Sequence, residues 1–296
     1  MKLNNPVLFL VPALIWGSTW LVIKFQLGIV DPMMSVGYRF LLAGLILLLY
    51  CRISKITLEF SGKQHLMMAI QGFLLFSTNY WLVYVSELYL TSGLVAVGFS
   101  TLIFFNIFLG GIFLRQAISF KVLIGAILGL TGTAIIFRPE LEAFDLTDDN
   151  FIGLMYCLSG VFFASCGNVM SAYNQKNELP VLQTNAFGMF YGAIYMLVIG
   201  LVSGKELVFD FSFQYVSSII YLTVFGSIVA FSTYLTLIGR VGAAKGAYVI
   251  LSIPVVAIIL STLFEGYIVS WYAISGIALI IGGNLLAMRE RRRITS

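Results

Sequence analysis

The polar side chains that could do chemistry in this chain are few, and most of them stand inside long apolar runs. Arg39 lies about two helical turns inside a run that begins at Pro32. A charged group at such a position is costly and is therefore a functional candidate, because it can attract a carboxylate or a phosphate. The alternative is a structural arginine that reaches outward or bonds to carbonyls at a helix break.

Aromatic and amide side chains at helical spacing form a second set of candidates. Trp16 and Trp20 are one helical turn apart, and so are Tyr80 and Tyr84, so each pair shares one helix face. Asn79 precedes the second pair. Buried amide and phenol groups need hydrogen-bond partners, which a polar cavity would supply. We predict that these side chains line a substrate cavity; the alternatives are hydrogen bonds between helices, packing against lipid, or an interfacial aromatic belt.

A third set of candidates lies in the second half of the chain. Tyr248 and Ser252 share one helical stripe that starts at Lys245, and we predict that both contact the substrate. Pro254 removes a backbone hydrogen bond from the same helix, so it is either a hinge or a static kink. Four further polar residues could complete the lining, or could only allow close helix approach: Ser165, Asn168, Ser227 and Tyr234.

Several kinds of catalytic chemistry lack the residues that they need. His65 is the only histidine, and the apolar runs contain no aspartate and no deep glutamate. The paired carboxylates or H-E-x-x-H arrangement of a protease are missing, and so is a phosphate-binding loop. The three cysteines have no paired spacing. We therefore expect no enzyme activity, no metal and no cofactor, and transport without a proton-binding group unless Glu87 or Glu265 supplies one.

The composition places most of the chain in a membrane. Of 296 residues, 60% are apolar and 10% are charged, and the mean hydropathy is +0.99. Soluble domains carry about 25% charged residues, so a soluble domain, a disordered chain and a nucleic-acid-binding protein are excluded. Runs of about 20 apolar residues predict an all-α polytopic membrane protein and exclude a β-barrel. We predict ten transmembrane helices: 6–28, 32–51, 65–86, 91–114, 119–137, 152–174, 180–203, 214–238, 243–264 and 270–288.

The basic residues predict the orientation of these helices. Most Lys and Arg residues fall in the loops on one side, whereas Lys24, Arg138 and Lys205 fall on the other side. Loops rich in Lys and Arg stay in the cytoplasm. We therefore expect a protein of the inner (plasma) membrane with both termini in the cytoplasm.

The two halves of the chain resemble each other. Residues 91–138 align without a gap with residues 242–289. Identical pairs across this alignment include Ala96/Ala247, Phe113/Phe264, Gly125/Gly276 and Arg138/Arg289. Five helices per half is an odd number, so the second half enters the membrane from the opposite side, as inverted repeats do. We predict two repeats, 6–137 and 152–288, that are related by a pseudo-two-fold axis.

Short motifs, in order along the chain, resemble those of a known family. Trp16-Gly-Ser-Thr-Trp20 is similar to the opening motif of EamA-type members of the drug/metabolite transporter superfamily. The stretch from Phe225-Gly-Ser through Gly242-Ala-Ala-Lys-Gly246 to Gly282-Gly-Asn284 is similar to their second repeat. The resemblance implies a ten-helix bundle of two inverted five-helix repeats around a central substrate cavity. Family members move amino acids, nucleosides, other metabolites and drugs, and many of them are exporters.

These expectations combine into one hypothesis. The chain is expected to be a secondary transporter that exports a small metabolite, such as an amino acid, by alternating access at a cavity halfway through the membrane. The alternatives are an exporter of drugs or lipid-like solutes and a membrane pore or assembly protein. The expected partners are a small-molecule substrate and the lipid bilayer, without nucleic acid, and the chain is expected to act as a monomer.

Overall fold

Every regular element in the described part of the chain is a helix. The computed structural model describes residues 3–117, 119–145, 148–264 and 269–288, and these residues contain no strand. The predicted all-α architecture is therefore confirmed for them. In chain order the elements are α1 (Asn5–Lys24), α2 (Pro32–Ile53), α3 (Gly62–Gln71), the π-helix η1 (Gly72–Thr78), α4 (Asn79–Tyr89), α5 (Ser92–Ser100), α6 (Leu102–Leu114), α7 (Phe120–Ile136), α8 (Arg138–Glu142), α9 (Asp148–Lys176), α10 (Val181–Val202), α11 (Phe213–Tyr221), the π-helix η2 (Leu222–Val229), α12 (Ala230–Val241), α13 (Ala243–Gly246), α14 (Tyr248–Phe264) and α15 (Trp271–Met288).

Among the described residues, seven helical stretches are long and apolar enough to cross a membrane. They are Pro32–Ile53, Gly62–Tyr89, Ser92–Leu114, Asp149–Lys176, Val181–Val202, Phe213–Val241 and Trp271–Met288, and each coincides with a predicted span. The other predicted spans coincide with shorter apolar helices: Asn5–Thr19, Phe120–Ile136 and Ala243–Ile259. Many large apolar side chains face outward, as contact with lipid requires.

Polar side chains fix where several helices begin. The first N–H groups of a helix have no partner within it, and a side-chain oxygen just before the first turn can accept a hydrogen bond from one of them. Asp31 accepts from the backbone N–H of Met33 at 2.8 Å, and Pro32 occupies the first helical position of α2. The same role falls to Asn4, Thr91, Ser119 and Ser212 at the starts of α1, α5, α7 and α11.

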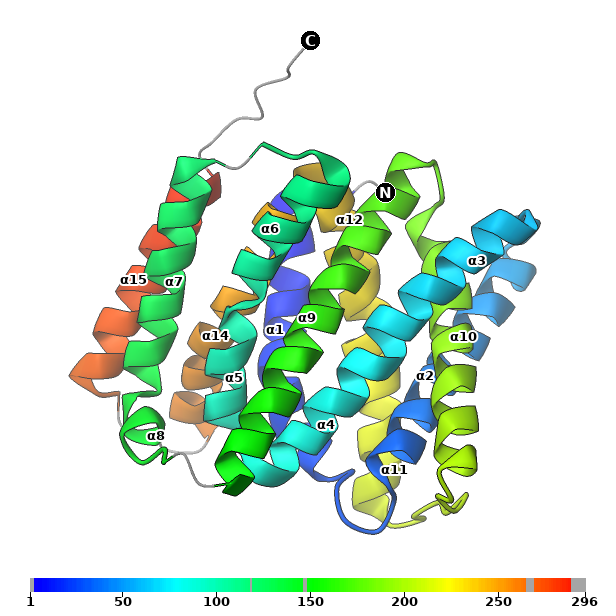
Figure 1. Ribbon diagram of the computed structural model, residues 1–296, viewed down its shortest axis with the longest axis horizontal. Coiled ribbons are helices and arrows are strands. Elements are labelled where there is room, and N and C mark those ends of the chain that lie inside the picture. Colours follow the sequence, from blue (N-terminus) through cyan, green and yellow to red (C-terminus); the bar gives the residue numbers. More distant parts are fainter. Residues whose placement is uncertain (1–2, 118, 146–147, 265–268, 289–296) are drawn as a thin grey trace.

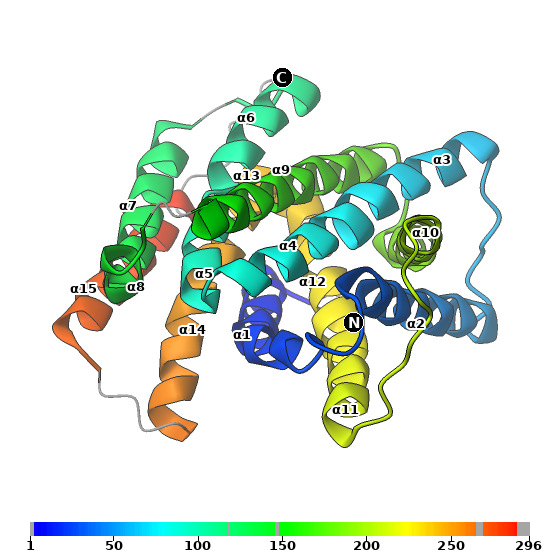
Figure 2. The same ribbon diagram turned by 60° about the horizontal axis from the view of Figure 1, so that its bottom comes forward.

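Helix α1 lies in the middle of the bundle, and two helix pairs form its ends (Figures 1 and 2). α14 packs on one side of α1 and α12 packs on the other. α4 and α9 lie side by side above α1 in Figure 2. One end of the bundle is α7 packed on α15, and the opposite end is α2 packed on α10. The interior is therefore surrounded by helices from both halves of the chain.

Glycines allow the end pairs to approach along their backbones. A Cβ atom on Gly125 of α7 would lie 2.6 Å from the carbonyl oxygen of Gly283 on α15. In the other pair, a Cβ atom on Gly44 of α2 would lie 2.7 Å from the backbone nitrogen of Phe190 on α10. Small residues commonly allow such close contact between membrane helices, because lipid offers no hydrophobic driving force for their association.

Two of the long helices contain π-helical segments. η1 separates α3 from α4, and η2 separates α11 from α12. η1 packs against α9 and α10, and η2 packs against α1 and α2. The apolar runs predict both spans but not these segments. Because π-helical turns are rare and occur mainly at functional sites, they direct attention to the interior beside α1.

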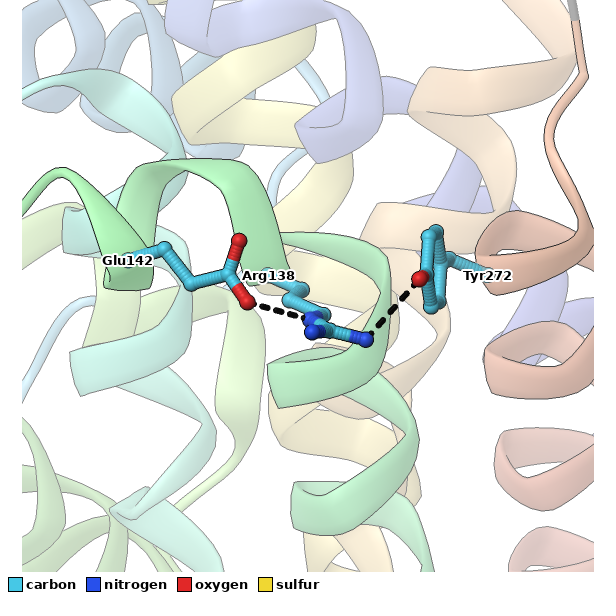
Figure 3. Close-up of polar contacts among 3 residues, drawn as sticks. All are labelled: Arg138, Glu142 and Tyr272. Carbon is cyan, nitrogen blue, oxygen red and sulfur yellow. Dashed lines mark hydrogen bonds and ion pairs between the residues drawn. The ribbon is translucent and has the colours of Figure 1, made fainter.

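An exposed cluster joins α8 to the beginning of α15 (Figure 3). The Nε atom of Arg138 lies 2.6 Å from Oε1 of Glu142, and its Nη1 donates to the Tyr272 hydroxyl at 2.9 Å. The hydrogen bond and charge of Glu142 raise the pKa of the Arg138 guanidinium, because both favour the cation. Ion pairs between exposed side chains contribute little to stability, so we treat this cluster as a surface contact.

Candidate functional site

A cavity of about 70 Å³ lies inside the bundle, beside α1. Side chains from both halves of the chain line it, and most of them are apolar. Both π-helical spans contribute, through Leu75 of η1 and through Tyr234, which follows η2 on α12. Six of the residues that the sequence predicts for the site line this cavity: Trp16, Arg39, Asn79, Tyr80, Asn168 and Tyr234.

Arg39 brings a buried positive charge to the cavity. Its side chain is 1% exposed. Nε donates to Oγ of Ser227 at 2.9 Å, and Nη1 donates to the Tyr84 hydroxyl at 3.3 Å. Among the described residues, the ion pairs join Arg138 to Glu142 and Lys205 to Asp31. The groups that contact the Arg39 guanidinium there are neutral. A buried charge without a counter-charge is costly, which marks Arg39 as a position for an anionic group of a ligand.

Aromatic rings and a buried amide hold the guanidinium in place. Its central carbon lies 4.7 Å from the ring centre of Tyr80 and 5.2 Å from that of Phe40. Contacts of this kind stabilise a cation in an apolar site. The hydroxyl of Tyr84 donates onward to Oε1 of Gln26 at 2.7 Å. The orientation of Arg39 is therefore fixed by the protein itself, which lowers the entropy cost of binding a ligand there.

Aromatic side chains form a second wall of the cavity. The ring of Trp16 meets Phe231 edge-on at 5.1 Å between centres and Tyr234 at 4.9 Å. The indole N–H of Trp16 donates to the backbone oxygen of Gly226 in η2 at 3.1 Å. A buried indole needs such a partner. The π-helical segment thus positions both an acceptor for Trp16 and, one residue later, the Ser227 hydroxyl that holds Arg39.

Two amides complete the polar lining. Nδ2 of Asn79 donates to the backbone oxygen of Gly160 at 2.8 Å, which ties α4 to α9. Nδ2 of Asn168 donates to the Tyr234 hydroxyl at 3.1 Å, whereas its Oδ1 is buried without a hydrogen-bond partner. An unpartnered buried acceptor costs about 1–3 kcal/mol, so Oδ1 of Asn168 is suited to bind a donor from a ligand.

Other predicted residues lie away from the cavity lining. Tyr84 stands behind Arg39, and Ser165 donates to Oδ1 of Asn106 at 2.7 Å. The Tyr248 hydroxyl donates to the backbone oxygen of Val122 on α7 at 2.6 Å. Ser252 accepts from Nδ2 of Asn284 on α15 at 2.8 Å. The structure therefore does not bring Tyr248 and Ser252 to the cavity; they join α14 to the pair of α7 and α15.

Pro254 is buried inside α14, and the helix continues through it. The interruption in this span comes earlier, at Ala247 between α13 and α14. The hinge function of Pro254 stays a prediction. Trp20 belongs to α1, but its side chain lies outside the described residues, and so does Glu265.

Sequence reasoning missed two buried amides near the site. Gln26 follows α1 and accepts from Tyr84, and Asn106 of α6 donates to the backbone oxygen of Ala243 at 3.0 Å. Asn106 is the one polar side chain in the sequence from Leu102 to Leu114, so a signal was present. A lone amide inside an apolar run needs a hydrogen-bond partner, so Asn106 was a candidate on the same grounds as Asn79.

Comparison with known proteins decides the family. The model of the EamA-like transporter family matches this chain twice, over residues 6–138 and 151–289. The chain belongs to the EamA-like transporter family. The matches cover nearly the whole chain, and the family description indicates a membrane transporter rather than an enzyme.

Several relatives of this EamA-like chain also match over most of their length. The protein PagO of Salmonella typhimurium is 23% identical over 298 residues, which cover 100% of this chain and 96% of PagO. The uncharacterized transporter YvbV of Bacillus subtilis is 25% identical, covering 95% and 90%. The uncharacterized inner membrane transporter YedA of Escherichia coli K12 is 28% identical, covering 90% and 86%. The names of YvbV and YedA support transport, and none of the three names identifies a substrate.

A solved structure shares the fold of this EamA-like chain. A protein whose description is only "Crystal structure of protein" superposes with a TM-score of 0.79 and covers 99% of both chains at 15% sequence identity. At that identity the similarity extends to the fold alone. The chain is thus a multi-pass membrane transporter with a buried, partly polar cavity, and the chemistry of its solute must be argued from the lining residues.

Proposed function

We propose that this EamA-like transporter exports a small metabolite that carries a carboxylate, such as an amino acid, and that Arg39 binds the carboxylate. The observation that carries the proposal is the guanidinium of Arg39, which is buried at the cavity and contacts neutral groups within the described residues. A planar guanidinium matches the two oxygens of a carboxylate and binds them with strong, charge-assisted hydrogen bonds.

The rest of the lining suits the ammonium group and side chain of an amino acid. Oδ1 of Asn168 is an unused acceptor, and an ammonium group supplies the donors that it lacks. The rings of Trp16 and Tyr234 add aromatic groups that attract a cation. The apolar remainder of the wall favours an uncharged side chain. A zwitterion would therefore find a partner for each of its charges.

Alternating access between two inverted repeats, 6–137 and 152–288, is the mechanism that we propose. The two matches of the family model support this division. Equivalent contacts support it too: α1 packs on α14 as α9 packs on α6, and η2 packs on α2 as η1 packs on α10. Each π-helical segment lies in the third span of its half. Two halves of similar construction can exchange conformations around a shared cavity.

The proposed location is the inner membrane, with both termini in the cytoplasm. Lys and Arg gather in the loops on that side. The relative YedA carries the name of an inner membrane transporter. The proposed export carries the solute from the cytoplasmic side outward.

Purified protein tests the proposal directly. Individual amino acids are screened for their ability to raise the melting temperature of the protein, because a ligand that binds the native state stabilises it. The best of them, labelled with ¹⁴C, is then followed in proteoliposomes. We expect Arg39→Gln to lose both the shift in melting temperature and the flux. Arg138→Gln, which removes an exposed arginine, is the control and keeps both.

A drug or lipid-like solute is the second candidate, and the largely apolar lining favours it. Such a solute does not need a carboxylate partner, so its flux would survive Arg39→Gln. A pore is separated from a carrier by counterflow, in which solute on the far side accelerates exchange through a carrier only. Wild-type amino-acid flux in Arg39→Gln, or the absence of counterflow, would contradict the proposed mechanism.

A further inference from the structure

A second and larger pocket lies where helices between the two end pairs terminate. Its volume is about 340 Å³, and α6, α9 and α12 end around it. The C-terminal ends of these three helices lie close together at the top of Figure 1. Polar side chains contribute much of the wall: Gln116, Gln175 and Lys176. We call this pocket the vestibule.

The vestibule and the central cavity share the same helix faces. On α9, Ala164 and Asn168 line the cavity, and Ala172 and Gln175 line the vestibule. These positions follow one another at steps of three or four residues, so they form one stripe of the helix.

α12 repeats this arrangement. Phe231 and Tyr234 line the cavity and Ile238 lines the vestibule, again at steps of three or four residues. The distance from Asn168 to Ala172 along α9 is one helical turn, or about 6 Å. The two spaces are therefore consecutive along the bundle rather than unrelated.

One hydrogen-bonded layer separates the two spaces. Asn168 of α9 donates to the hydroxyl of Tyr234 on α12, and α9 also contacts Asn106 of α6 through Ser165. Asn106 in turn accepts from Ser165 and donates to the backbone oxygen of Ala243. Asn106, Asn168 and Tyr234 are each at most 2% exposed. Polar groups from three helices that can change partners therefore lie on the vestibule side of the cavity, alongside packed aliphatic side chains such as Leu235 and Ile238.

The walls of the vestibule are arranged around its glutamines. Nε2 of Gln175 donates to the backbone oxygen of Leu235 at 2.8 Å. A Cβ atom on Gly239 would overlap the side-chain amide of Gln175, so the lack of a side chain there makes room for it. A Cβ atom on Gly242 would lie 3.2 Å from Oε1 of Gln116. The side-chain amides of both glutamines therefore lie close against glycines of α12 and of the turn after it, where a side chain would crowd them.

We infer that the vestibule is a second solute site, through which the transported carboxylate-bearing solute reaches the cavity across the Asn106–Asn168–Tyr234 layer. This inference rests on the proposed function. Lys176 supplies a positive charge for the carboxylate at the rim, and the glutamine amides can both donate and accept. The exposed side chain of Lys176 implies weak, rapidly reversible binding, as an entrance requires.

Thiol labelling tests the vestibule without knowledge of the solute. In a background with all three native cysteines replaced by serine, Ala172→Cys is expected to react with the anionic reagent sulfonatoethyl methanethiosulfonate. Lys176→Gln should slow this reaction severalfold but leave the reaction with a neutral reagent unchanged. Tyr173→Cys is the matched control: it is the next residue, its native side chain is 41% exposed and outside the vestibule lining, and we expect it to face lipid, where a thiol reacts slowly.

Flux provides the second test. Ala172→Trp fills the vestibule and should reduce ¹⁴C-amino-acid flux at least about tenfold, while the amino acid still raises the melting temperature through the intact cavity. Tyr173→Trp should keep both. Labelling of Ala172→Cys no faster than Tyr173→Cys, or wild-type flux in Ala172→Trp, would overturn the inference. A wild-type protein that no amino acid stabilises counts against the proposed function instead, and the labelling result still stands.

Discussion

At the scale of single residues, Arg39 combines high burial with partners that carry no charge. Its guanidinium is held by Ser227, Tyr84 and the ring of Tyr80. Neutral partners fix the direction of the group without neutralising it. The charge therefore remains free to bind a solute, and the geometry of the fork, not the charge alone, should decide affinity.

Arg39→Lys tests this argument. Lysine keeps the charge but loses the planar fork, so one of two charge-assisted hydrogen bonds to a carboxylate is lost. We expect KM for the transported amino acid to rise by roughly tenfold to a hundredfold, since one such bond contributes about 1.5–3 kcal/mol. The concentration dependence of flux in proteoliposomes measures it. Arg138→Lys, at an exposed site, should leave KM unchanged; an unchanged KM in Arg39→Lys would rule out recognition by the fork.

Tyr234 offers a second test at this scale. Tyr234→Phe removes the hydroxyl that accepts from Asn168 and leaves that amide without its partner. We expect the free energy of unfolding to fall by about 1–3 kcal/mol, because the amide stays buried. Tyr195→Phe is the control, since Tyr195 is 40% exposed on the outside of α10. Equal melting temperatures for the two variants would show that the layer contributes nothing to stability.

The site was only partly predictable from the sequence. Depth inside an apolar run indicated Arg39, Asn79 and Asn168, because a polar group there needs a partner, and all three line the cavity. Their role in binding stays a prediction. A helical stripe also linked Tyr248 to Ser252, but a stripe shows only that residues share a face and not what that face meets. In the structure it meets α7 and α15.

At the scale of elements, the spans follow from the apolar runs, but the π-helical segments do not. Hydrophobicity does not distinguish a π-helical from an α-helical hydrogen-bond pattern, because apolar side chains continue from η1 into both flanking helices. Close backbone contact accompanies η1: a Cβ atom on Gly72 would overlap the carbonyl oxygen of Gly188 on α10. Such a contact depends on a helix that is distant in sequence, so no local pattern could reveal it.

Gly72→Ala should therefore destabilise the protein. The added methyl group meets backbone rather than a flexible side chain, and overpacking of this kind costs typically about 1–3 kcal/mol. Gly282→Ala is the matched control, because no atom lies within 4 Å of the added Cβ. There the helix propensity of alanine should stabilise the protein by up to about 1 kcal/mol. Melting temperatures in detergent measure both; a stable Gly72→Ala would mean that α10 can move away from η1 at little cost.

At the scale of the whole molecule, equivalent helices of the two proposed repeats form the two ends of the bundle. α2 and its equivalent α10 pack together at one end, and α7 and its equivalent α15 at the other (Figure 2). The cavity lies among the helices between these ends. Glycine-mediated contacts hold the end pairs, whereas hydrogen bonds between polar side chains hold the layer beside the cavity. We expect the hydrogen-bonded layer to rearrange more readily than the end pairs.

The orientation in the membrane decides what the vestibule does. Arg115 and Arg240 are sequence neighbours of residues that line the vestibule. Loops rich in such residues stay in the cytoplasm. Single cysteines on either side test this. In a variant without the native cysteines, Glu59→Cys between α2 and α3 should react with an impermeant thiol reagent only in inside-out vesicles. Glu206→Cys between α10 and α11 should react with it only in intact cells whose outer membrane is permeabilised. Both side chains are exposed. The reverse pattern would turn the vestibule outward and make it an exit; labelling from one side only would refute the predicted topology.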